Sequence, residues 1–117
     1  MIEDIDYLIS SVEYDSDNKM IDKVRTHEKQ DEYGVGYPYA EHRKQLLNNL
    51  KEGKSYYTLV QQEGSEFDYN VGEKVVIVEI QGNEYIRIDK ERNEKNYLGD
   101  VKTMSPINTE NEHYPDR

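Results

Sequence analysis

The amino-acid sequence predicts an α+β domain: a mainly antiparallel sheet of about five strands, able to curl as a half-barrel, with one helix packed on it. Two observations carry this prediction. Residues 39–52 have the apolar spacing of an amphipathic helix, whereas the segments on both sides are rich in β-branched and aromatic residues. Tight polar turns join several of these segments, and strands joined by such turns pair antiparallel.

A hairpin is expected first, with strands at about 7–14 and 20–27. Between them stands "YDSDNK", in which Asp, Ser and Asn side chains can bond to their own backbone and stabilise a turn. Residues 1–6 fit either a short helix or a frayed end, and the sequence leaves that choice open.

The helix is expected to begin near Pro38, whose ring is tolerated in a first helical turn. Gly53 is expected to end it as a C-terminal cap. Its apolar stripe consists of Ala40, Leu46, Leu47 and Leu50.

Three or so strands are expected after the helix. "SYYTLVQQ" predicts a strand and "EGSEFDYNVGE" a charged turn. "KVVIVEI" and "YIRID" flank a Gly-Asn turn, which indicates a hairpin of about 74–80 with 84–89. We expect "NYLGDV" to pack back on it through Tyr97, Leu98 and Val101.

One domain over residues 1–102 and a polar C-terminal tail over 103–117 are the expected organisation. The residues expected to form most of the core are Val12, Val24, Leu46, Leu47, Leu50, Leu59, Val75, Val76, Ile77, Val78, Ile80, Ile86 and Ile88.

Composition excludes several classes of function. A net charge of −10 opposes direct binding to nucleic acid or to anionic membrane. The absence of cysteine excludes disulfides, thiolate nucleophiles and cysteine-ligated zinc. No segment resembles a signal peptide or a membrane span, so a cytoplasmic protein is expected.

The glycines of "YGVGYPYAEHR" match a dinucleotide-binding loop at Gly34 and Gly36 only, because Tyr39 stands where that pattern needs a third glycine. Asp31 and Glu32 would also repel phosphate. We therefore expect a turn that leads into the helix and no nucleotide cofactor.

Asp15 and Asp17 resemble the start of a calcium loop, but Lys19 and Met20 stand where that loop needs an oxygen ligand and glycine. His27, His42 and His113 share no spacing typical of zinc ligands. No nucleophile pattern is present either, so the sequence predicts neither a metal site nor catalytic residues.

Tyrosine is the most informative residue type, with 11 copies against one Phe and no Trp. Many must serve as core, yet tyrosine is also favoured at recognition surfaces. We expect a non-enzymatic protein-binding module, contacting another protein or a second copy through Tyr33, Tyr37, Tyr39 and Tyr57.

An alternative is an acidic decoy or inhibitor, of phage or mobile-element type, that covers a basic nucleic-acid-binding protein. It requires one contiguous negative strip, made by Asp4, Asp6, Glu13, Asp15, Asp17, Glu63, Glu66 and Asp68.

Taken together, "ISSVEYDSDNKMIDKVRTHE", "HRKQLLNNLKEGKSYYT", "GEKVVIVEIQGNEYIRID" and "NYLGDV" resemble a family of small uncharacterised bacterial proteins, a domain of unknown function. The resemblance spans about residues 9–101. It implies an α+β domain with a hairpin, one helix and a β meander, and it implies no catalytic residue.

Overall fold

The computed structural model describes residues 5–17, 19–29, 35–61 and 69–104. Over these ranges the elements are, in order, β1 (Tyr7–Tyr14), β2 (Ile21–Glu28), β3 (Tyr39–His42), α1 (Arg43–Lys51), β4 (Tyr56–Gln61), β5 (Tyr69–Lys74), β6 (Val76–Ile80), β7 (Asn83–Arg87) and β8 (Lys102–Thr103). One helix among mostly antiparallel strands confirms the broad α+β prediction.

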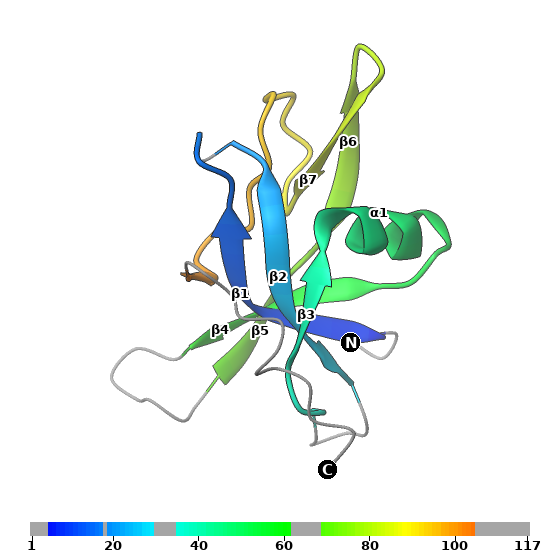
Figure 1. The fold of residues 1–117 in the computed structure, drawn as a ribbon. Coiled ribbons are helices and arrows are strands. Elements are labelled where there is room, and N and C mark those ends of the chain that lie inside the picture. The colour runs from blue at the N-terminus through cyan, green and yellow to red at the C-terminus, as the bar shows by residue number, and fades with distance from the viewer. Residues whose placement is uncertain (1–4, 18, 30–34, 62–68, 105–117) are drawn as a thin grey trace.

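The main sheet is open and six-stranded, with the order β3-β2-β1-β4-β5 and with β8 also paired to β1 (Figure 1). β1 pairs in parallel with β4 through Tyr7–Ile9 and with β8 through Ser11–Val12. The remaining pairs are antiparallel. β3 and α1 intervene between β2 and β4, and this longer connection lets β4 return parallel to β1.

The predicted N-terminal hairpin is confirmed as β1 and β2. Its turn is held by Asp15, whose Oδ1 accepts the backbone N–H groups of Asp17 and Lys19 at 3.2 and 3.1 Å. The carboxylate thus supplies the local hydrogen bonds that turn-forming residues provide. At the other end of β1, Ile5 and Asp6 belong to neither helix nor strand, and residues 1–4 lie outside the described ranges.

The predicted start of the helix at residue 39 is wrong, because Tyr39–His42 form strand β3 against Lys23–Thr26 of β2. The helix begins four residues later, at Arg43. Pairing with β2 provides partners for the backbone groups of residues 39–42 that face β2, and the Glu41 side chain is buried. The predicted end is correct, since Gly53 has a φ of 96° just after the last turn.

The charged turn expected at 63–73 is also wrong in its second part, because β5 begins at Tyr69 and pairs with β4. The following hairpin is confirmed with shifted ends, since Lys74 closes β5 and β7 ends at Arg87. Positive φ values at Gln81 and Gly82 (53° and 84°) form its turn.

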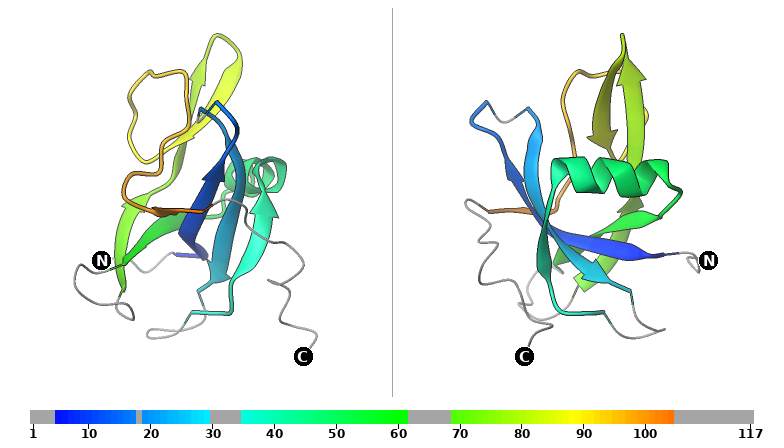
Figure 2. Two further views of the ribbon diagram at one scale, coloured as in Figure 1. Left: turned by 60° about the vertical axis from the view of Figure 1, so that its left-hand side comes forward. Right: turned by 45° about the vertical axis from the view of Figure 1, so that its right-hand side comes forward.

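The core lies between α1 and one face of the main sheet, with the β6–β7 hairpin closing one end (Figure 2). Of the predicted core residues, nine are buried, while Leu50, Val76, Ile77 and Ile88 are half-buried. Leu98 and Val101 are buried as expected, and Tyr97, although 41% exposed, forms a β-bridge with Arg87 of the hairpin. Further buried apolar side chains that the prediction did not include are Leu8, Ile9, Ile21, Tyr56 and Tyr85.

Candidate protein-contact surface

The structure separates the tyrosines that the sequence grouped as one contact. Tyr37 is the most exposed large apolar side chain of the described residues, at 77%. Tyr39 is half-buried on β3 and Tyr57 is half-buried on β4, with β2 and β1 between these strands. Tyr33 lies outside the described residues. Tyr37 is therefore the predicted contact residue with an openly accessible ring.

The segment that presents Tyr37 is tied to β2. The Gly36 N–H donates to the Glu28 carbonyl at 2.7 Å, and Val35 forms a β-bridge with Lys29. The His27 ring lies between the Gly36 carbonyl at 2.9 Å and the Ser10 hydroxyl at 2.8 Å. Because a carbonyl only accepts, Nδ1 of His27 must carry the proton that bonds Gly36. Residues 35 and 36 are thus held against β2 in the unbound chain.

Val35, at 43% exposed, stands two residues from Tyr37. We call Val35, Gly36 and Tyr37 the 35–37 surface. It borders β3, which forms one edge of the sheet. A fixed backbone that exposes one aliphatic and one aromatic side chain is the kind of surface on which protein contacts form, since little entropy is lost on binding.

Tyr39 stands beside a buried polar cluster, which we call the Glu41 cluster. The Glu41 carboxylate, only 1% exposed, accepts hydrogen bonds from Thr26 at 2.9 Å, Asn49 at 3.0 Å and the Tyr56 hydroxyl at 3.0 Å. Burial raises the pKa of Glu41 despite these donors. Burial and the nearby Glu41 charge likewise raise the pKa of Tyr39.

The Glu41 cluster joins β2, β3, α1 and β4, so its role is to fasten the helix to the sheet. Tyr56 also stacks on Tyr7, with ring centroids 4.9 Å apart. Sequence reasoning missed this cluster because Glu41 precedes a basic, helical-looking run and reads as an exposed residue of that helix.

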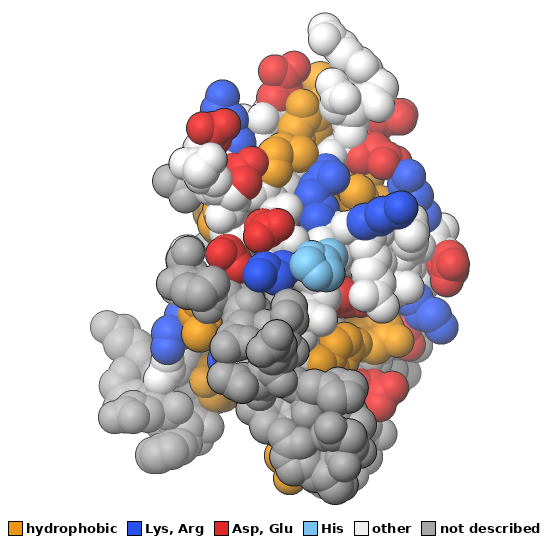
Figure 3. Space-filling model, in the orientation of Figure 1, with side chains coloured by type: hydrophobic (Ala, Val, Ile, Leu, Met, Phe, Trp, Pro, Cys, Tyr) orange, Lys and Arg blue, Asp and Glu red, His pale blue; other side chains and the backbone are white. Residues whose placement is uncertain are grey.

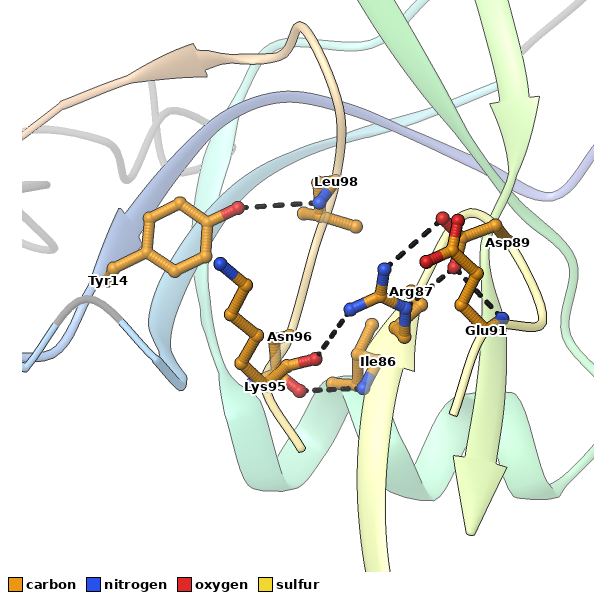
Figure 4. Close-up of polar contacts among 8 residues, drawn as sticks. All are labelled: Tyr14, Ile86, Arg87, Asp89, Glu91, Lys95, Asn96 and Leu98. Carbon is orange, nitrogen blue, oxygen red and sulfur yellow. Dashed lines mark hydrogen bonds and ion pairs between the residues drawn. The ribbon is translucent and has the colours of Figure 1, made fainter. Parts of the chain in front are cut away.

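A second polar cluster fastens the segment after β7 (Figure 4). Arg87 is buried and donates to Asp89 at 2.6 and 3.2 Å and to the Lys95 carbonyl at 3.0 Å. Its guanidinium also lies 5.1 Å from the Tyr97 ring centroid. The hydrogen bond from Arg87 lowers the pKa of Asp89. These contacts hold the segment after β7 against the strand, which is a structural role.

The acidic strip required by the decoy alternative is only partly within the described residues. Asp6 precedes β1, whereas Glu13, Asp15 and Asp17 lie at or beyond its far end. An eight-residue strand spans about 25 Å, so these two groups stand well apart. Figure 3 shows acidic and basic side chains interspersed over the face drawn. The alternative remains a prediction without a structural observation in its favour.

Within the described ranges, no group of three or more His, Cys, Asp or Glu side chains is placed to hold a metal ion. The same ranges contain no helix that is long and apolar enough to cross a membrane.

No family model, curated protein or solved structure matches this chain. The resemblance to small bacterial proteins therefore stays a prediction, and functional inference depends on the surface of the molecule itself.

Proposed function

We propose that this chain is a non-enzymatic protein-binding module of the cytoplasm that contacts its partner through the 35–37 surface. The partner is another protein or a second copy of the chain. The observation that carries the proposal is the exposure of Tyr37 on a loop held by backbone and histidine hydrogen bonds.

The anchored loop also narrows the set of contact residues. Tyr39 stands beside the Glu41 cluster, and two strands, β2 and β1, separate the strand of Tyr57 from β3, so Tyr37 and Val35 are the residues to test first. A tyrosine at the centre of a contact contributes about 2 kcal/mol, which corresponds to roughly 30-fold in affinity.

The test compares Tyr37→Ala with the wild type in two measurements. One is the capture of proteins from a lysate of the source cells, and the other is the sedimentation of the purified chain. We expect Tyr37→Ala to weaken one specific captured interaction, or self-association, by at least tenfold. Tyr97→Ala is the matched control, because Tyr97 is also exposed and lies after β7, away from the 35–37 surface.

Tyr37→Ala removes no side chain of the buried core, so the variant should keep the wild-type fold, which circular dichroism checks. An unchanged set of captured proteins together with an unchanged sedimentation profile would overturn the proposal.

A further inference from the structure

Strand β5 forms an edge of the main sheet, and β4 is its sole partner strand among the described residues (Figure 2). It lies at the opposite end of the strand order from β3 and hence from the 35–37 surface. Edge strands carry a row of backbone groups that are available to another chain.

The register shows which backbone groups of β5 face outward. Lys74 is opposite Tyr57, and the N–H of Val75 donates to the carbonyl of Tyr56 at 2.8 Å. In an antiparallel ladder this bond flanks a non-hydrogen-bonded pair, so the N–H and C=O of Lys74 point away from β4.

Past the bulge at Gly72, Val71 is opposite Leu59 and Tyr69 is opposite Gln61. Both are again non-hydrogen-bonded pairs of the ladder. Tyr69, Val71 and Lys74 therefore present their backbone groups outward. Within the described ranges, no other segment provides a hydrogen-bond partner for these groups.

The side chains of β5 are exposed as well. Tyr69 is 48% exposed and Val71 is 40% exposed, and a two-residue spacing places them on the same face of the sheet. An added strand would satisfy the outward backbone groups and cover these two side chains at once.

Charge indicates which strand would fit. The chain carries a net charge of −10 at pH 7. A second copy carries the same net charge and is repelled as it approaches, whereas a basic segment is attracted. A two-fold pairing centred on Val71 would also place Tyr69 against Glu73, within the irregular stretch opposite Thr58. A basic segment is not repelled by this net charge, and its register along β5 is not fixed by a two-fold axis.

We propose that β5 accepts, as an additional strand, an extended segment of another protein that alternates apolar residues with lysine or arginine. Main-chain hydrogen bonds to Tyr69, Val71 and Lys74 hold the segment, its apolar side chains cover Tyr69 and Val71, and its basic side chains are attracted by the net negative charge of the chain.

The test uses a displayed library of random ten-residue segments, selected in parallel on the wild-type chain and on Val71→Pro. Proline at position 71 removes an outward N–H and leaves the hydrogen bonds to β4 in place. We expect the wild type to enrich alternating basic and apolar segments. A synthesised winner should bind Val71→Pro at least tenfold more weakly and should slow amide exchange at Tyr69, Val71 and Lys74.

Val71→Lys serves as a second variant if the proline disturbs folding, because a positive charge at the edge repels a basic segment. Tyr37→Ala should bind the winner as the wild type does, so failure here is distinguishable from failure at the 35–37 surface. Three results would each overturn the proposal. They are a selection that enriches no segment, wild-type affinity of the winner for both position-71 variants, and self-association of the wild type that Val71→Pro abolishes.

Discussion

At the scale of single residues, Glu41 is unusual because an ionisable carboxyl group is buried in the protein interior. It is a carboxyl group 1% exposed, surrounded by three side-chain donors. The donors favour the ionised form, but burial disfavours it more strongly, so the pKa of Glu41 in the fold lies above its usual value.

The raised pKa of Glu41 sets the sign of a pH effect. A carboxyl group whose pKa is raised on folding contributes most stability below its unfolded pKa of about 4.3, where it is protonated in both states. That contribution is lost as the pH rises through the folded-state pKa. Relative to Glu41→Gln, which cannot ionise, the wild type should therefore lose free energy of unfolding with rising pH.

Urea unfolding of both proteins across this range measures the difference. Glu79→Gln, at an exposed position of β6, is the matched control for the removal of one carboxyl group. A difference between wild type and Glu41→Gln that stays constant with pH would show that burial of Glu41 does not govern its ionisation.

At the scale of elements, β5 depends on one glycine at its bulge. A Cβ at Gly72 would collide with Oγ1 of Thr58, a buried hydroxyl that accepts the N–H of Glu73 at 2.9 Å. We expect Gly72→Ala to destabilise the chain by about 1–3 kcal/mol, because the crowded Thr58 must move and its hydrogen bond is lost.

A double-mutant cycle with Thr58→Ala checks this cause by chemical denaturation. In the Thr58→Ala background the added methyl group has room, so Gly72→Ala should cost less than it does in the wild type. Equal costs in both backgrounds would place the effect of Gly72→Ala in backbone flexibility instead of in the collision.

At the scale of the whole molecule, net charge dominates. A charge of −10 on 117 residues makes the folded state repel itself more than the expanded chain does. We expect the melting temperature to rise by several degrees between 10 and 500 mM sodium chloride, because salt screens this repulsion. Circular dichroism measures it, and a melting temperature that falls with salt would show that attractive ion pairs outweigh the repulsion.

Local patterns determined most of the elements. Turn-forming residues after Tyr14 and the Gly82 turn predicted both hairpins, and β-branched residues predicted the strands around them, because these signals act between residues close in the chain. Composition similarly determined the charge and excluded cysteine chemistry.

Tertiary structure decided the rest. Tyr39–His42 became a strand because β2 offered a pairing edge, and Glu41 became buried because three donors from distant segments met it. The parallel neighbours of β1, the open edge of β5 and the separation of Tyr37 from Tyr57 are likewise set by strand order. A sequence encodes local preference residue by residue, whereas pairing and burial depend on which segments meet after the chain has folded.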